Sequence, residues 1–536
     1  MTRDTESMAK EAMFKSEEAV KGHEDKKTTP PEMEETPKAT GTGTSYVDTT
    51  RVNQDARYNL DIRSDRVSVL DAYKQESKMP TKYMAICPLD GRYAEIEERL
   101  WPYFSEYALV KARVNIEVNW LLFLTEQIGN DDCVSMQVNG EEFDRIMDIA
   151  INFNEHAFLR VKSIEDTTKH DVKAVELYVA EKLKERGLSK LVSFVHFGCT
   201  SEDITNLAYA TLIRDFIDDM YAPMCQSLIS QLYHFSDKYA DVAMLAHTHG
   251  QPATPTTMGK EFAVFAYRLE NEYDDLMRCR IMGKINGATG NYAAWKVAFP
   301  DKDWRKLSQS FVEGCLEIDF NPVTTQIESH DYTARLMDSV RHINNIIRDL
   351  DQDMWLYISK FYIKLKVVKT EVGSSTMPHK VNPIKFENSE GNVKIGNPIC
   401  YAISEELPKS RLQRDLSDST LQRNIGLAFG YSLQAIMQTM EGLGRSAVNE
   451  VAIAEDLENN WAVLAEPIQT MLRKYGVPNA YDQLKELTRG REVTKEDIHN
   501  FIDSLDMLSA MDRKTLKELT PSTYIGYAAE IARDDP

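Results

Sequence analysis

The residues of this sequence that are best suited to chemistry lie in one polar stretch, 371–383, which reads EVGSSTMPHKVNP and is called the signature loop below. It contains the hydroxyls of Ser374 and Ser375, the ammonium of Lys380 and the carboxamide of Asn382. Together with backbone N–H groups of the loop, these groups are able to receive a carboxylate. The stretch has almost no apolar periodicity, so it predicts a shaped loop, and a flexible polar connection is the alternative.

A histidine with similar potential stands in the stretch 246–255, which reads AHTHGQPATP. Its two prolines and its glycine predict an irregular backbone that exposes His249. A histidine held in a rigid break between two long helices is a candidate for proton transfer near neutral pH. The alternative is an ordinary surface or core histidine.

Two further polar segments stand at predicted helix starts. Lys169, His170 and Asp171 precede one helix, and Thr200 and Ser201 precede another. Asp171 favours a helix N-terminus electrostatically, and either hydroxyl residue is a suitable N-cap. Because helix N-termini also bind anions, capping and ligand binding are compatible here.

Basic residues gather locally in this acidic chain. Arg414 and Arg423 flank Ser419 in the segment 409–424, and this cationic cluster is suited to a phosphate. Pairing of these arginines with aspartates of the same segment is the alternative. Arg92 and Tyr93 follow a glycine turn and form either a solvated loop pair or a contact for a phosphate or a base.

Long helices must position these segments. Apolar residues recur at alternating steps of four and three through 331–364, which predicts a long helix with a heptad seam. The seam consists of Leu336, Val340, Ile343, Ile347, Leu350, Met354, Tyr357 and Phe361. Such a stripe is buried best in a helical bundle shared between subunits. A second long helical pattern, from about 421 to 448, follows the signature loop.

The glycine-rich stretch 283–292 is a weak candidate for a nucleotide-binding loop. It has neither the strand that precedes such a loop nor its lysine.

Length and composition exclude several classes of protein. A chain of 536 residues predicts two to four domains, and a net charge of −21 argues against nucleic acid or an anionic membrane as the main partner. The seven cysteines show neither a C-x-x-C pair nor metal-ligand spacing, which predicts reduced thiols in a cytosol-like compartment. No apolar run approaches the roughly 18 residues that span a bilayer. Residues 1–80 are dense in charged residues, Thr and Pro, and are predicted to be disordered.

Taken together, these motifs resemble the fumarase/aspartase superfamily and, within it, the adenylosuccinate lyase family. The resemblance runs from about residue 86 to residue 532. The signature loop marks the superfamily, while the stretches THGQP at 248–252 and TSED at 200–203, with Arg414 and the run 419–423, favour the adenylosuccinate branch. Lys169 departs from the family pattern, in which Asn or Arg often precedes the His-Asp pair, and the acidic N-terminal extension lies outside it.

The resemblance implies an all-α fold of three helical domains after the disordered extension. The implied boundaries are 1–80 for the extension, 81–190 for the N-terminal domain, 191–443 for the central long-helix domain and 444–536 for the C-terminal domain. It also implies a cytoplasmic homotetramer in which the central helices form a common bundle and each active site takes residues from three subunits.

The reaction implied by the resemblance is β-elimination of fumarate in purine biosynthesis. Adenylosuccinate would give AMP, and the succinyl-carboxamide ribotide (SAICAR) would give the carboxamide ribotide (AICAR), with no cofactor and no metal. Ser374 would act as the catalytic base and His249 as the acid. The implied substrate-binding residues are Arg92, Tyr93, Lys169, His170, Asp171, Thr200, Ser201, Gln326, Ser375, Lys380, Val381, Asn382, Asn388, Arg414, Ser419, Thr420, Leu421, Gln422 and Arg423.

Other functions stay open at this point. Argininosuccinate lyase and fumarase share the signature loop, but neither needs the additional arginine cluster for a phosphate. A protein of another class, a catalytically silent structural protein on the same bundle, would be expected to have lost Ser374 or His249, and both are present. The acidic extension could instead make the chain a scaffold in a multi-enzyme assembly.

Overall fold

A computed structural model describes residues 85–129, 133–368, 373, 376–490 and 492–534. The chain divides into two units, residues 1–79 and residues 80–536, and only the second contains described residues. The predicted N-terminal extension therefore lies outside the described residues, as do Ser374 and Ser375 of the signature loop.

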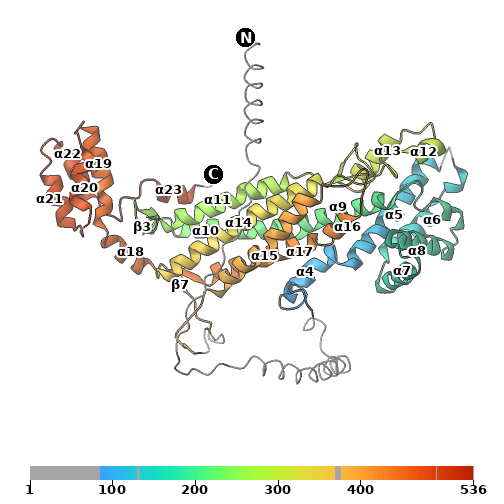
Figure 1. The fold of residues 1–536 in the computed structure, drawn as a ribbon, viewed down its shortest axis with the longest axis horizontal. Helices are drawn as coiled ribbons and strands as arrows, with labels where there is room; N and C mark the ends of the chain where they lie inside the picture. The colour runs from blue at the N-terminus through green and yellow to red at the C-terminus, as the bar shows by residue number, and fades with distance from the viewer. Residues whose placement is uncertain (1–84, 130–132, 369–372, 374–375, 491, 535–536) are drawn as a thin grey trace, which may run out of the picture. The chain divides into compact units, whose positions relative to one another are not determined.

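The unit 80–536 consists mainly of helices (Figure 1), which confirms the all-α prediction. The α-helices are α4 (Ala94–Phe104), α5 (Glu106–Ile128), α6 (Gly140–Ile151), α7 (Glu155–Thr168), α8 (Asp171–Glu185), α9 (Ser201–Phe216), α10 (Ala222–Lys238), α11 (Met258–Met277), α12 (Ala293–Ala298), α13 (Trp304–Gln309), α14 (Asp331–Ser359), α15 (Ile384–Glu406), α16 (Ser417–Gln422), α17 (Ile425–Gly444), α18 (Glu450–Glu458), α19 (Ala465–Lys474), α20 (Ala480–Thr488), α21 (Lys495–Asp503), α22 (Ala510–Glu518) and α23 (Ala528–Arg533). The short 3-10 helices are η2 (Val134–Met136), η3 (Ser189–Phe194) and η6 (Trp461–Leu464), and the π-helices are η4 (Ile217–Tyr221) and η5 (Ser310–Cys315).

The described strands are pairs of two or three residues that close loops. Three pairs are antiparallel: β1 (Ala243–Met244) with β4 (Thr256–Thr257), β2 (His247–Thr248) with β3 (Gln251–Pro252), and β7 (Ile363–Leu365) with β8 (Ser446–Val448). The fourth pair, β5 (Met282–Gly283) with β6 (Asp319–Phe320), is parallel. This pair begins the glycine-rich stretch, for which the sequence showed no strand signal.

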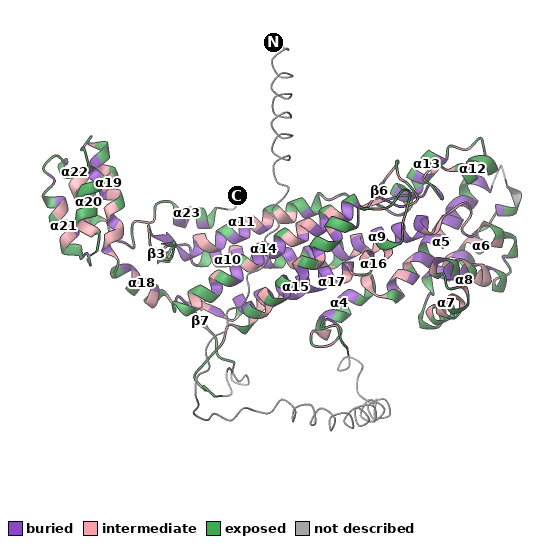
Figure 2. Cartoon of the chain, in the orientation of Figure 1, coloured by how far each residue is buried: buried purple, intermediate pink, exposed green. Residues whose placement is uncertain are grey.

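The centre of the unit is a bundle of the five longest helices that follow α9. α14 packs against α11 and α15, α17 packs against α15 and α10, and α10 packs against α11. These helices run alongside one another, and their buried faces point at each other (Figures 1 and 2). The bundle core is mainly aliphatic with some aromatic side chains, and Phe104 at the end of α4 joins an aromatic group with Phe216 and Phe429.

The heptad prediction for the central helix is largely confirmed. α14 spans 29 residues, which at 1.5 Å per residue is about 43 Å, and the seam from Leu336 to Met354 is buried. The last seam position is wrong, because the helix ends at Ser359. Phe361 follows with a left-handed backbone (φ 60°) and is 71% exposed.

The second long pattern corresponds to α17, which has 20 residues, but α15, which has 23, was not predicted. α15 contains Pro398, and its buried face carries small or polar residues, among them Ser389, Asn392 and Gly396. A Cβ on Gly396 would lie 3.0 Å from Cβ of Tyr431 on α17, so the two helices approach closely there. The apolar stripe of α15, formed by Phe386, Val393, Cys400 and Ile403, is therefore interrupted by small and polar residues, although the helix lies inside the bundle.

Three smaller cores lie outside the bundle core, towards its two ends (Figure 1). One joins α5, α6, α7 and α8, an aromatic one contains Trp120, Trp295 and Phe311, and one is formed by the helices from η6 to α22. The domain boundaries at 190 and 443 stay a prediction. All seven cysteines are free thiols, and no helix among the described residues is long and apolar enough to cross a membrane.

Candidate active site

The N-terminus of α9 has the capped geometry that the sequence predicted. Thr200 is the N-cap, and its N–H donates to Oδ2 of Asp203 at 2.8 Å. Ser201 is the first residue of the helix. Because this carboxylate lies in the first turn, it stabilises the positive end of the helix dipole.

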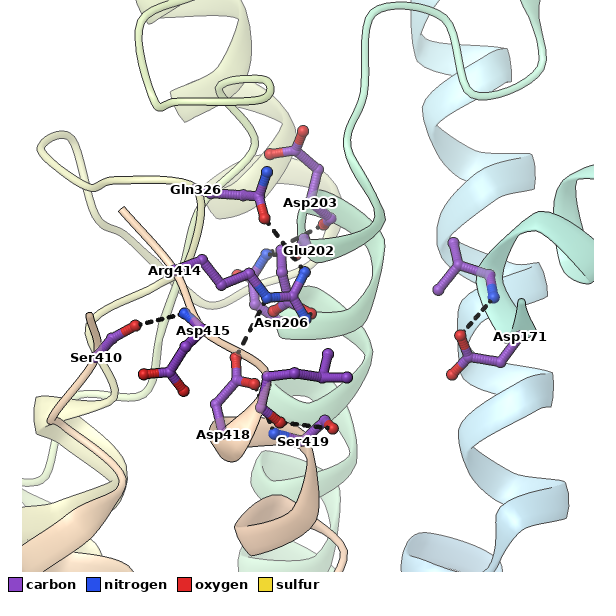
Figure 3. A network of polar contacts seen from close by, with 12 residues as sticks. Asp171, Glu202, Asp203, Asn206, Gln326, Ser410, Arg414, Asp415, Asp418 and Ser419 are labelled. Carbon is purple, nitrogen blue, oxygen red and sulfur yellow. Dashed lines mark hydrogen bonds and ion pairs between the residues drawn. The ribbon is translucent and has the colours of Figure 1, made fainter. Parts of the chain in front are cut away.

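Arg414 lies beside this helix start, in contact with three other side chains (Figure 3). It donates to Oε1 of Glu202 at 2.8 Å and to Oε1 of Gln326 at 3.4 Å, and its Nε lies 3.7 Å from Oδ2 of Asp418. The sequence left two interpretations of the arginine cluster, a phosphate site or pairing with aspartates of the same segment. In the structure, Arg414 is paired with Asp418 of that segment. The structure adds a carboxylate from α9 that the sequence analysis did not consider.

Both carboxylates around Arg414 are buried, with side chains 3% exposed. Burial raises the pKa of Glu202 and of Asp418, and the charge of Arg414 opposes this rise. Oε2 of Glu202 and Oδ2 of Asp418 have no hydrogen-bond partner within the described part of the chain. The cluster can therefore accept a further partner.

His330 is a buried neighbour of this cluster that the sequence analysis missed. It has a left-handed backbone (φ 61°) immediately before α14. Burial, and then the charge of Arg414, lower the pKa of His330 to about 4, so the ring is neutral at pH 7. Its Nε2 is buried without a hydrogen-bond partner among the described residues. A histidine just before a long apolar stripe was the available signal.

The predicted run 419–423 forms the end of α16 and does not face one side. Arg423 donates to the carbonyl oxygen of Ser419 at 2.9 Å and to its Oγ at 3.3 Å, as expected four residues apart on a helix. Thr420 is exposed, Leu421 is half-buried and Gln422 is buried. Ser419 and Arg423 are therefore the members of the run that share one face.

His170 and Asp171 begin α8, as predicted. His170 is the N-cap, and its Nδ1 accepts a hydrogen bond from the N–H of Lys173 at 3.2 Å. Asp171 pairs with Arg113 at 2.8 Å. Burial alone would raise the pKa of Asp171, but the charge of Arg113 and the hydrogen bonds to the carboxylate lower it. Lys169 caps α7 in a left-handed conformation (φ 53°), and its side chain is 78% exposed.

Arg113 was also missed by the sequence analysis. It is buried in α5, where an arginine inside an apolar run was the only available signal. A buried arginine normally has an acidic partner, and here that partner is Asp171.

Tyr93 and Asn388 come from opposite parts of the sequence and are in contact. Nδ2 of Asn388 donates to the hydroxyl oxygen of Tyr93 at 3.1 Å, and Oδ1 of Asn388 accepts from Gln434 at 3.4 Å. Arg92 is exposed beside them in the sequence. Two residues that were predicted independently thus lie together at the start of α15.

The described part of the signature loop is a connection between β7 and α15. Nδ2 of Asn382 donates to the carbonyl oxygen of Gly373 at 2.6 Å and so holds the base of the loop closed. Gly373, Val381 and Asn382 line a cavity of about 230 Å³ that reaches the end of α17. Lys380 is exposed.

His249 lies in a hairpin turn and not in an irregular segment. Strands β2 and β3 pair on either side of His249 and Gly250, which have φ values of 55° and 71°. Positive φ at both positions is typical of a tight two-residue hairpin turn. His249 is exposed, as predicted.

Within one chain, the hairpin strand β3 and the short helix α16 lie towards opposite ends of the bundle (Figure 1). His247 of the hairpin accepts a hydrogen bond at Nε2 from Lys360, immediately after α14, at 2.8 Å. The Arg414 cluster lies near His330, immediately before α14. Because the neighbours of these two sites lie at the two ends of α14, which is about 43 Å long, His249 and Arg414 are far apart in the same chain.

Two family models match the chain: Lyase over residues 91–395 and Adenylosuccinate lyase C-terminal over residues 410–525. Adenylosuccinate lyase of Vibrio cholerae is 45% identical over 451 residues, covering 83% of this chain and 98% of that relative. Adenylosuccinate lyase of Escherichia coli K12 is 45% identical over 445 residues, covering 83% and 97%.

Solved structures share the fold at low sequence identity. The fumarate lyase from Mesorhizobium sp. BNC1 has a TM-score of 0.66 at 16% identity, covering 82% of this chain and 96% of that chain. The 3-carboxy-cis,cis-muconate lactonizing enzyme from Pseudomonas putida has a TM-score of 0.62 at 18% identity, covering 81% and 95%. The close relatives and both family models thus agree with the motifs, and the chain belongs to the adenylosuccinate lyase family of the fumarase/aspartase superfamily.

Proposed function

We propose that the chain cleaves adenylosuccinate to AMP and fumarate, and SAICAR to AICAR and fumarate, as an amidine-lyase of purine biosynthesis. The observation that carries this proposal is the 45% identity to adenylosuccinate lyases over nearly their whole length. The C-terminal family match speaks for this branch over argininosuccinate lyase or fumarase.

The elimination needs a base for a weakly acidic C–H beside a carboxylate and an acid for the departing nitrogen. Ser374 is the proposed base and His249 the proposed acid. Removal of the proton places a second negative charge on the succinyl carboxylate. Lys380 and Asn382, with Ser375 and Val381 of the same loop, stabilise this charge in the proposal, and the exposure of Lys380 leaves its ammonium available for it.

The remaining residues bind the nucleotide in this proposal. Arg414, Arg423 and Ser419 receive the phosphate and ribose, together with Arg92 and Tyr93. The base and the succinyl group are oriented by Lys169, His170, Asp171, Thr200, Ser201, Gln326, Asn388, Thr420, Leu421 and Gln422. The unpaired buried carboxylate oxygens near Arg414 support a ligand group there that donates hydrogen bonds, such as a ribose hydroxyl, because buried polar atoms are normally paired.

The site is proposed to form between copies of the chain in a cytoplasmic homotetramer. One chain alone keeps His249 and Arg414 at opposite ends of α14. Helices aligned side by side in a symmetric bundle would bring the hairpin of one copy to the Arg414 cluster of another. Exposed apolar residues on the bundle helices, such as Tyr267 on α11, Trp355 on α14 and Ile395 on α15, support such an interface.

A direct assay tests the reaction. Purified protein is incubated separately with adenylosuccinate, argininosuccinate and malate, and fumarate formation is followed by ultraviolet absorbance. Fumarate from adenylosuccinate alone is the expected result. Fumarate from either of the other substrates without cleavage of adenylosuccinate would refute the proposal, and no cleavage of any substrate would favour a structural protein.

Mixing two inactive variants tests the shared site. His249→Ala and Arg414→Ala are unfolded together and refolded as mixed oligomers. If each site takes these residues from two copies, up to about a quarter of the sites regain both side chains and activity returns. Activity that stays at the level of the separate variants would place both residues of each site in one chain.

A further inference from the structure

A fully buried ion pair lies next to the proposed substrate contacts of α9. Nζ of Lys284 is 2.8 Å from Oδ1 of Asp203, and both side chains are 0% exposed. Burying two charges is costly unless further hydrogen bonds satisfy them. Neither residue is among the predicted site residues.

The Asp203 carboxylate supplies those further bonds by joining two backbone segments. Its Oδ2 accepts from the N–H of Thr200 at 2.8 Å and from the N–H of Gly287 at 3.1 Å. Its Oδ1 accepts from the N–H of Asn286 at 2.9 Å, in addition to Lys284. One side chain therefore holds the start of α9 against the glycine-rich stretch 283–292.

The same stretch holds Gln326. Nε2 of Gln326 donates to the carbonyl oxygen of Ala288 at 3.1 Å. Nδ2 of Asn286 donates to Oγ1 of Thr324 at 2.7 Å, two residues before Gln326. The chain of contacts thus runs from the Asp203 carboxylate through the glycine-rich stretch to Gln326 and, through it, to Arg414.

A second set of hydrogen bonds holds the backbone of Lys284 to the side chain of Asn206 on α9. Lys284 donates its N–H to Oδ1 of Asn206 at 2.8 Å, and Nδ2 of Asn206 donates to the carbonyl oxygen of Lys284 at 2.9 Å. Lys284 is thereby held through its backbone as well as its ammonium. Replacing the ammonium leaves these two backbone bonds in place, so the effect of the charge can be tested separately.

We propose that Asp203 and Lys284 are positioning residues of the active site, which set the distance between the hydroxyls of Thr200 and Ser201 and the carboxamide of Gln326. The role rests on the proposed function, because those three residues are proposed substrate contacts. A pair that served stability alone would change the unfolding of the protein and leave the kinetics of the folded protein as they are.

A double-mutant cycle tests this role on the full-length protein. Kinetic constants for adenylosuccinate are measured for the parent, Lys284→Met, Gln326→Ala and the double variant, and circular dichroism establishes that each is folded. Methionine retains the length of the side chain without its charge. We expect Lys284→Met to lower kcat/KM about tenfold or more. The fold-loss in kcat/KM of the double variant should be smaller, by a factor of at least about five, than the product of the fold-losses of the two single variants.

Two more variants complete the experiment. Asp203→Asn is taken through the same cycle and is expected to show the same coupling to Gln326. Arg280→Met is the matched control, because Arg280 forms an exposed ion pair with Asp319 at 2.7 Å close to the same glycine-rich stretch. We expect kcat/KM of this control to stay within about twofold of the parent.

Independent losses, whose product equals the loss of the double variant within about twofold, would overturn the positioning role. So would parent-like kinetics of Lys284→Met, or failure of both Lys284→Met and Asp203→Asn to fold, since the pair would then be purely structural. A parent that cleaves no adenylosuccinate would refute the proposed function and the positioning role with it. An active parent with independent losses would refute the positioning role alone.

Discussion

Gly198 is the position at which the backbone before α9 is most sensitive to substitution. It has φ 70°, a conformation that glycine adopts readily and alanine does not. A Cβ there would overlap Nε1 of Trp295 and lie 2.7 Å from its Cε2. The same indole donates to the carbonyl oxygen of Phe197 at 2.7 Å, so the overlap would also break that hydrogen bond.

The expected cost of Gly198→Ala follows from these three effects. A left-handed alanine costs about 1–2 kcal/mol, an overpacked core about 1–3 kcal/mol and a broken buried hydrogen bond about 1–3 kcal/mol. We expect the free energy of unfolding to fall by about 3–8 kcal/mol. Because Thr200 follows two residues later, kcat/KM for adenylosuccinate should fall as well.

Urea unfolding, followed by tryptophan fluorescence and circular dichroism at equal protein concentrations, measures this cost. Gly140→Ala is the control, since Gly140 begins α6 and a Cβ there has no atom within 4 Å. Alanine at that position should change the free energy of unfolding by about 0.5 kcal/mol or less, or stabilise the helix. A parent-like urea midpoint for Gly198→Ala, or an equal loss in the control, would refute the reasoning.

Three further outcomes are expected. Ser374→Ala should abolish turnover and still bind adenylosuccinate in calorimetry, because the binding groups remain; turnover near the parent rate would remove Ser374 from the base role. His249→Ala should lower kcat by several orders of magnitude, and an effect on KM alone would make His249 a binding residue. For His196, burial would lower the pKa, but the hydrogen bond and charge of Glu117, 2.6 Å away, raise it above its ordinary value of 6.5. The stabilisation of the folded state by the His196–Glu117 pair is therefore full below pH 6.5 and is lost as the pH rises through the folded-state pKa of His196. Glu117→Gln should accordingly lower the free energy of unfolding by about 1–3 kcal/mol at pH 6 and by less at pH 9. An equal loss at both pH values would contradict this sign.

Short-range features of the fold were predicted from the sequence. The helix start at His170 and Asp171, the N-cap at Thr200 and the seam of α14 from Leu336 to Met354 depend on residues within a few positions of each other, and the structure has all of them. α15 was missed because Ser389 and Gly396, which pack closely against neighbouring helices, interrupt the apolar stripe by which buried helices are recognised.

The sequence by itself determined the family, the all-α class and the identity of the polar segments, since motif spacing and helix periodicity are local properties of the chain. Only the tertiary structure decided the partners of those segments. Arg414 meets Glu202 across 212 positions, and Asp203 meets Lys284 across 81. Likewise, the length of α14 keeps His249 away from Arg414 in one chain. The physical reason is that such contacts depend on how long helices pack against one another, and no local pattern encodes which distant charge will share a buried site.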